Sequence, residues 1–177
     1  MPGHTLLNDG WHLFSNSCAH LKGWAATGGR WFYLDELERT VGDRLRVITA
    51  EARSYLGVTS VGHRRYDVIV SDCFGGAEPV RELATVEALR LVRGSLNAGG
   101  IYVANIVSAN EGGDVTFLRD CAATALEVFI HAWVVPCGDA KFGGEENYLL
   151  IASDGDYAFA EAVPFDTDFL GTVLHDK

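Results

Sequence analysis

The chain has few cysteines, few prolines and a shortage of positive charge. Four of its 177 residues are cysteine and four are proline, and 14 Lys and Arg stand against 24 Asp and Glu. The cysteines form no CxxC pair and no spacing with histidine that is typical of a metal site. A net charge of −10 disfavours contact with the phosphate backbone of nucleic acids. We therefore expect no disulfide framework, no metal site and no nucleic-acid partner.

Long hydrophobic runs are also missing. No apolar run reaches the roughly 18 to 20 residues that cross a membrane. Residues 1–30 lack the basic start and unbroken apolar core of a signal peptide. What is present is ordinary for a globular protein, with 48% hydrophobic and 21% charged residues. We expect a cytoplasmic protein with one well-formed core and no membrane partner.

One stretch organises the chain, YDVIVSDCFGG at residues 66–76. Its continuous β-branched run at 68–70 is typical of a strand that is covered on both faces. A glycine pair then frees the backbone to turn. Asp72 stands at the carboxyl end of this strand, where ligands bind in open α/β sheets. A structural role remains open, in which Asp72 caps a loop amide or pairs with a base.

The first part of the chain is the hardest to interpret. Residues 1–30 are interrupted by glycines and predict irregular structure, with a short helix around 12–22. The following elements are then expected: a helix over 31–39, a strand over 44–50, and one or two helical turns over 51–56 that Gly57 ends.

The second part alternates strands and helices. Pro79 suits the first turn of a helix, and an apolar stripe at helical spacing follows until Asn97 and the glycines behind it. The stripe consists of Leu83, Val86, Leu89, Val92 and Leu96. The later elements are a strand over 101–107, a helix over 115–127 capped by Asp114, and strands over 128–135 and 147–153.

This alternation predicts an α/β fold with a mostly parallel sheet. Because no helix separates the last two strands, the final strand is expected to run antiparallel to its neighbour. We assign residues 1–30 to an irregular segment, 31–153 to the α/β domain, and 154–177 to a tail that packs irregularly over an edge.

Three segments together resemble the spermidine synthase family. They are LRVITAEARSYL at 45–56, YDVIVSD at 66–72, and LNAGGIYVANIV at 96–107. The resemblance implies a Rossmann-like, class I methyltransferase-like fold with helices on both faces of the sheet. It also implies transfer of an aminopropyl group from decarboxylated S-adenosylmethionine to a polyamine such as putrescine, in polyamine biosynthesis. The alternatives are an S-adenosylmethionine-dependent methyltransferase, and a non-catalytic remnant or dimerising module of the same fold.

The resemblance also implies roles for single residues. Asp72 matches the family's catalytic aspartate, which orients and deprotonates the attacking amine. Glu51 stands where the family contacts the amino group of adenine, and the amide of Ala52 would contact the ring. Asn105 falls near a polar position that lines the substrate cleft.

Two further residues join the predicted site. The family's second acid is replaced by Gly75, and Glu78 is our candidate to bind the far amine in its place. Cys73 is assigned to the cofactor side of the site, with plain packing as the alternative. An adjacent acid such as Asp72 raises the pKa of a thiol and disfavours a reactive cysteine.

The main departure from the family concerns its first two strands and their GxGxG turn, which are not found. In the family the strand order is 3-2-1-4-5-7-6. Without strands 1 and 2, the strand at 44–50 lacks a neighbour and the edge of 66–72 is open. Residues 1–30 could supply a substitute, the two strands could pair directly, or a second chain could cover the gap in a homodimer. We favour a fourth interpretation, an incomplete reading frame.

Overall fold

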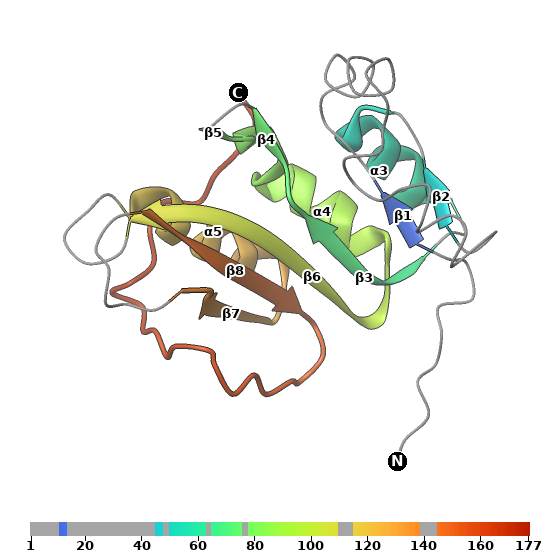
Figure 1. The fold of residues 1–177 in the computed structure, drawn as a ribbon. Helices are drawn as coiled ribbons and strands as arrows, with labels where there is room; N and C mark the ends of the chain where they lie inside the picture. The colour runs from blue at the N-terminus through green and yellow to red at the C-terminus, as the bar shows by residue number, and fades with distance from the viewer. Residues whose placement is uncertain are drawn as a thin grey trace. The chain divides into compact units, whose positions relative to one another are not determined.

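The structure is a computed structural model of residues 1–177. It describes residues 11–13, 45–47, 50–62, 65–75, 78–109, 115–138 and 145–177 (Figure 1). The chain divides into two compact units, Met1–Tyr55 and Leu56–Lys177, and each is described by itself. The domain boundaries expected at residues 30 and 153 remain predictions.

The first unit contains a pair of parallel strands. β1 (Trp11–Leu13) pairs with β2 (Leu45–Val47). β2 confirms the strand expected over 44–50, and its neighbour comes from residues 1–30. The helix expected around 12–22 is wrong at its start, because Trp11–Leu13 is a strand. The rest of that segment and the helix expected over 31–39 lie outside the described residues.

Helix α3 (Ala52–Val61) is longer than expected. Gly57 does not end it, and the helix continues to Val61. Glycine costs about 1 kcal/mol in a helix interior, and contacts beyond Gly57 offset this cost. The buried Thr59 hydroxyl lies 3.0 Å from the Ser95 hydroxyl. The Arg65 guanidinium donates to the carbonyls of Thr59, at 3.2 Å, and Gly62, at 2.6 Å, which satisfies the end of the helix.

The second unit is built on a four-stranded sheet in the order β3-β6-β8-β7. The strands are β3 (Tyr66–Ser71), β6 (Leu96–Ala109), β7 (His131–Pro136) and β8 (Glu145–Ser153). β3 and β6 are parallel, and β8 runs antiparallel to both of its neighbours. The antiparallel last strand is therefore confirmed, and the strands expected at 101–107 and 147–153 lie inside β6 and β8. The strand expected over 128–135 starts later, because Val128 still belongs to a helix.

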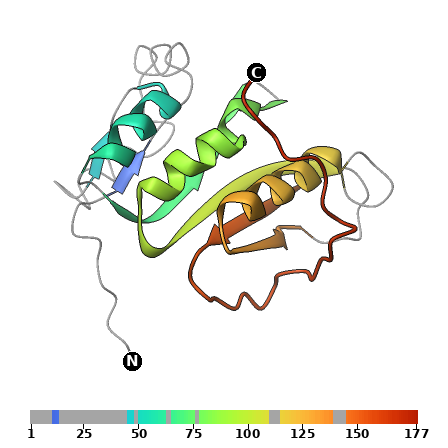
Figure 2. The ribbon, with the colours of Figure 1, turned by 180° about the vertical axis from the view of Figure 1, so that it is seen from behind.

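Helices α4 (Val86–Gly94) and α5 (Thr116–Val128) cover one face of this sheet, behind it in Figure 1 and in front of it in Figure 2. The core lies between the helices and the sheet. It includes the following buried residues: Val86, Leu89, Val92, Tyr102, Ile106, Leu118, Ala122, Val134 and Leu150. None of the described helices has both the length and the apolar character to cross a membrane.

The prediction that β3 is covered on both faces is wrong. Val68 is 44% exposed and Val70 is 63% exposed, while Ile69 between them packs on the core. Within the described sheet β3 is an end strand, and it pairs with β6 alone. The β-branched run indicated a strand correctly, but it does not say how many layers cover that strand.

The segment between β3 and α4 also differs from expectation. Pro79 lies in β5 (Glu78–Pro79), which pairs with β4 (Phe74–Gly75), and a short 3-10 helix, η3 (Arg81–Leu83), follows. The cap of α4 is Thr85, whose hydroxyl accepts from the Ala88 amide at 3.3 Å. The residues expected to end the helix, 97–100, belong to β6. Gly99 there has φ +71°, which allows a turn-like backbone inside the strand.

Helix α5 confirms the helix expected over 115–127, with Leu118, Ala122 and Ala125 buried. The cap expected at Asp114 is wrong, because Val115 occupies the capping position and makes no side-chain cap bond. Asp114 itself lies outside the described residues.

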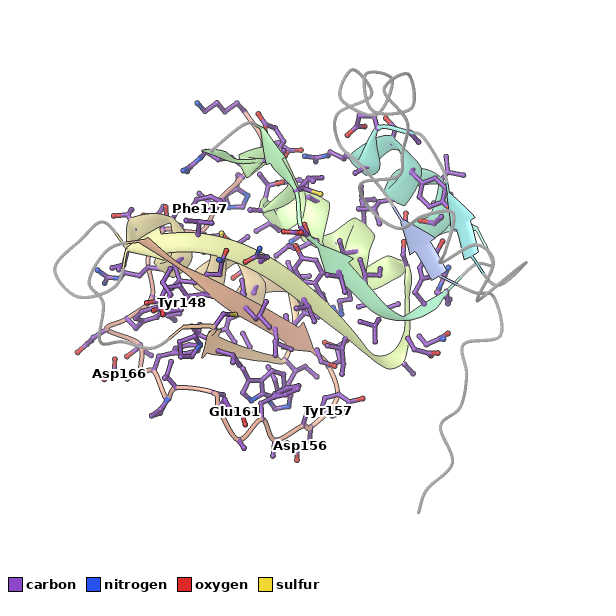
Figure 3. All side chains as sticks on the ribbon, in the orientation of Figure 1. Phe117, Tyr148, Asp156, Tyr157, Glu161 and Asp166 are labelled. Carbon is purple, nitrogen blue, oxygen red and sulfur yellow. The ribbon has the colours of Figure 1, made fainter. Side chains whose placement is uncertain are left out.

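The tail is irregular, as expected, and lies first along the β7 edge of the sheet. Its Val163 forms an isolated bridge with Val134, and Phe159 contacts Trp133 edge to face with ring centres 5.1 Å apart. Figure 3 labels Tyr157 and Glu161 on this part of the tail.

Residues 166–176, here called the strap, then cross the helices (Figure 2). The Arg119 side chain donates to the Phe169 carbonyl at 2.6 Å. Thr172 N donates to the buried Asp120 carboxylate at 2.7 Å. The Leu174 amide donates to Thr124, and its carbonyl accepts from Val86 N, both at 2.9 Å. The strap therefore ties α5 to the first turn of α4.

Candidate active site

Asp72 is the first residue after β3 and lies at the carboxyl end of that strand, beside the parallel strand β6. Its side chain is exposed. Ser71 pairs with Ala104 in the β3–β6 register, so the next residues along the two strands, Asp72 and Asn105, are neighbours. The Asn105 amide nitrogen donates to Asp72 Oδ1 at 2.9 Å. The structure thus brings together the predicted catalytic acid and one predicted substrate-binding residue.

The orientation of the Asn105 amide follows from its partner. An ionised carboxylate can only accept hydrogen bonds, so the amide nitrogen must face Asp72. The other amide atom, Asn105 Oδ1, is then directed inward. It is buried and has no hydrogen-bond partner among the described residues.

A small cavity of about 30 Å³ adjoins this pair. Its lining includes Asn105, Ser71, Cys73 and Tyr102, together with Phe117 of α5, which is labelled in Figure 3. A cavity of this size holds a water molecule. Pockets for drug-sized ligands measure about 300 to 1,000 Å³, so this cavity does not accommodate a nucleoside.

Burial is the largest influence on the pKa values of three ionisable groups around the cavity. Burial raises the pKa of the Cys73 thiol, and the charge of Asp72 raises it further against a hydrogen bond with Ser71. Burial also raises the pKa of Cys121 to about 12 and raises the pKa of the Tyr102 hydroxyl. These groups are therefore neutral at physiological pH. A neutral, partly buried Cys73 packs and hydrogen-bonds rather than acting as a nucleophile, and its assignment to the cofactor side stays a prediction.

Glu51 lies in the first unit, directly before α3. Its carboxylate accepts from the backbone amides of Arg53 at 2.9 Å and Ser54 at 2.7 Å. The hydrogen bond from the Ser54 side chain, followed by these two amides, lowers the pKa of Glu51. Glu51 therefore caps α3, and Ala52, which is 7% exposed, begins it. The adenine contacts expected at Glu51 and Ala52 remain predictions.

The remaining candidates are only partly described. Glu78 lies in β5 opposite Gly75, and its side chain lies outside the described residues. Its role toward a second amine stays a prediction. Ser71, Tyr102 and Cys121 around the cavity were not expected as site residues. The sequence carries no signal for them, because the strand register that places Tyr102 near Ser71 cannot be read from residue order.

The strand order of the second unit matches the last four strands of the order 3-2-1-4-5-7-6, with the antiparallel strand between its two neighbours. The fold is class I methyltransferase-like. Among solved structures, the chain is similar to a probable spermidine synthase from Corynebacterium glutamicum ATCC 13032, with a TM-score of 0.70 and 22% identity over 94% of this chain and 63% of that one. A spermidine synthase from Thermotoga maritima has a TM-score of 0.59 and 16% identity over 83% and 46% of the two chains.

Methyltransferases share this fold as well. Human methyltransferase-like protein 13, in complex with SAH, has a TM-score of 0.57 and 20% identity over 89% of this chain and 64% of that one. The chain thus spans less than two thirds of the length of each of these class I methyltransferase-like proteins. No protein-family model and no curated protein matches it.

Proposed function

We propose that the chain takes part in aminopropyl transfer from decarboxylated S-adenosylmethionine to a polyamine acceptor such as putrescine. The observation that carries the proposal is the Asp72 carboxylate at the carboxyl end of β3, exposed and held by Asn105 from the neighbouring strand. The fold supports it, since a similar structure with a TM-score of 0.62 is a spermidine synthase in complex with the transition-state analogue AdoDATO. Polyamine biosynthesis is the corresponding cellular role.

The chemistry requires a base. A primary alkylammonium has a pKa near ~10, so at neutral pH it cannot attack until it loses a proton. Asp72 can bind the ammonium, orient it and accept that proton as the amine forms its bond to the methylene carbon. The carbon–sulfur bond breaks, its electron pair stays on sulfur, and methylthioadenosine leaves. Because Asp72 is exposed, its proton then passes to solvent.

The acidic balance of the chain also suits this substrate. A net charge of −10 attracts a polyamine dication over a distance. The cavity of about 30 Å³ that Asn105 lines is too small for the nucleoside. The adenine contacts predicted at Glu51 and Ala52 therefore need a test of their own.

Isothermal titration calorimetry with methylthioadenosine tests nucleoside binding. We expect heat of binding for the wild type and a weaker signal for Glu51→Ala. Turnover of putrescine with decarboxylated S-adenosylmethionine tests the acid, and Asp72→Asn should lower kcat by about 100-fold or more. Asp67→Asn is the matched control, because Asp67 lies on the same strand and is held by Asn97 at 2.7 Å. An equal fall of kcat in Asp72→Asn and Asp67→Asn would contradict a catalytic role for Asp72.

A methyltransferase is the second candidate, favoured by the likeness to human methyltransferase-like protein 13. Product analysis separates the two reactions, because S-adenosylmethionine would then donate a methyl group and leave S-adenosylhomocysteine. If the protein binds neither methylthioadenosine nor S-adenosylhomocysteine and turns over neither donor, it is instead a non-catalytic module of this fold.

A further inference from the structure

β3 and β6 are joined by two Asn–Asp bridges, one at each end of β3. At the amino end, Asn97 Nδ2 donates to Asp67 Oδ1 at 2.7 Å. At the carboxyl end, Asn105 Nδ2 donates to Asp72 Oδ1 at 2.9 Å. The two bridges have the same chemistry and join the same pair of strands. A role limited to holding the strands together would therefore be common to both.

The carboxyl-end bridge differs in its surroundings. Asn97 is exposed, whereas Asn105 is partly buried and its Oδ1 is buried without a hydrogen-bond partner among the described residues. A buried carbonyl oxygen is almost always matched by a donor in a folded protein. The Asn105 amide thus has one polar atom bound to Asp72 and the other buried without a partner among the described residues.

The adjoining cavity provides room for the missing donor. Its volume of about 30 Å³ exceeds the ~10–15 Å³ that one water molecule requires. Ser71 and Tyr102 also line it, and their hydroxyl groups can both donate and accept. A water molecule there would have Asn105 Oδ1 as an acceptor and hydroxyl groups as further partners, which meets the usual need for two to four polar contacts.

We propose that Asn105 is a positioning residue for Asp72, with its amide nitrogen holding Asp72 Oδ1 and its carbonyl oxygen anchored by one water molecule in the adjoining cavity. Anchored at both atoms, the amide cannot turn over, and the carboxylate is held in one rotamer. The second oxygen of Asp72 is then left for the ligand. The effect of this arrangement on turnover rests on the proposed function, but the arrangement itself does not.

Nuclear magnetic resonance of the ¹⁵N-labelled protein tests the arrangement without any substrate. The side-chain amide signals of Asn105 are identified by their loss in Asn105→Leu, and those of Asn97 by their loss in Asn97→Leu. We expect the Asn105 hydrogens to exchange with solvent far more slowly than those of Asn97. Equal exchange of the two amides would overturn the proposal.

A high-resolution crystal structure tests the anchor. We expect a water molecule at roughly 2.7–3.2 Å from Asn105 Oδ1, inside the cavity. A dry cavity, or the ammonium group of a soaked diamine in that place, would overturn the assignment of a water anchor.

Kinetics test the consequence for Asp72. In Asn105→Leu we expect kcat to fall by about 100-fold, the loss typical of a misplaced catalytic group, with little change in KM. Asn97→Leu should leave both constants unchanged, and Asn105→Gln, which keeps the amide, should recover part of kcat. Should Asn105→Leu fail to fold, Asn105→Ala removes the donor without adding a charge beside Asp72. Wild-type protein without turnover would refute the proposed function, and the amide exchange would still decide the arrangement.

Discussion

Gly171 in the strap lies where the backbone leaves no room for a side chain. A Cβ atom there would lie 2.3 Å from Asp120 Oδ1 and 2.8 Å from the Asp120 amide nitrogen. We expect Gly171→Ala to lower the free energy of unfolding by about 1–3 kcal/mol, because the strap must move off the helix. Urea denaturation measures this change.

Gly57 in α3 is the matched control. A Cβ atom there meets nothing within 4 Å, and alanine is the better helix former. Gly57→Ala should therefore raise the free energy of unfolding by about 0.5–1 kcal/mol. If both variants lowered the free energy of unfolding by the same amount, the close contact at Gly171 would not be the cause of the loss.

Glu51 makes the stability of α3 dependent on pH. Its pKa in the folded protein is lowered below the ordinary value for glutamate, chiefly by the hydrogen bond from the Ser54 side chain. A lowered folded pKa gives stability that is present above the unfolded pKa and is lost as the pH falls through the folded one. We expect Glu51→Gln to lose less stability than the wild type on acidification from about pH 6 to about pH 3, measured by urea denaturation. If the free energy of unfolding fell equally with pH in the two proteins, the capping role of Glu51 would be contradicted.

Single residues of the site were predictable to different degrees. Asp72 could be identified because a β-branched run followed by an acid and glycines marks the carboxyl end of a strand. Asn105 was identified through the family resemblance, but its contact with Asp72 was not. That contact depends on the register of β3 against β6, which tertiary packing fixes. The roles of Ser71 and Tyr102 at the cavity depend on the same register.

At the scale of elements, the first turn of α4 depends on the strap. The Thr85 hydroxyl accepts from the Ala88 amide and donates to Asp176 at 2.8 Å. Thr85→Ala removes both bonds, and we expect a loss of about 1–2 kcal/mol in the free energy of unfolding. Thr172→Ala is the control, because Thr172 contacts Asp120 through its backbone amide, which the change preserves. Similar losses in both variants would contradict a special role for the cap.

Helix and strand types followed from periodicity, whereas their ends did not. Three members of the predicted stripe, Val86, Leu89 and Val92, lie buried in α4, because burial against one sheet face requires helical spacing. The outer two do not belong to the helix, since Leu83 lies in η3 and Leu96 begins β6. Gly57 and Pro79 were misjudged for a common reason. Each has a local preference that later contacts override, namely the Thr59 and Arg65 contacts of α3 and the pairing of β5 with β4.

At the scale of the whole molecule, the strap contributes to the stability of the second unit. It supplies donors to Asp120, which is only 7% exposed, and to the buried Thr124. Removing residues 169–177 takes these donors away from Asp120 and Thr124 and opens the contact of the strap with α5. We expect a lower thermal midpoint and faster amide exchange in α5 than in a control that lacks only Lys177. An unchanged midpoint would show that the strap adds nothing to stability.

The division of the chain into two units was not predicted, because it falls between Tyr55 and Leu56, inside helix α3 and not at a linker.

The order of the sheet has a further consequence, for the time course of folding. β8 is the last strand of the sheet to leave the ribosome, yet it lies between β6 and β7. Until it arrives, β7 has no partner in the described sheet, and Trp133 and its neighbours are exposed to other nascent chains. The strands of the sheet therefore cannot pair in their order of synthesis, and we expect a holdase chaperone to be most useful to this protein until Ser153, the end of β8, has emerged.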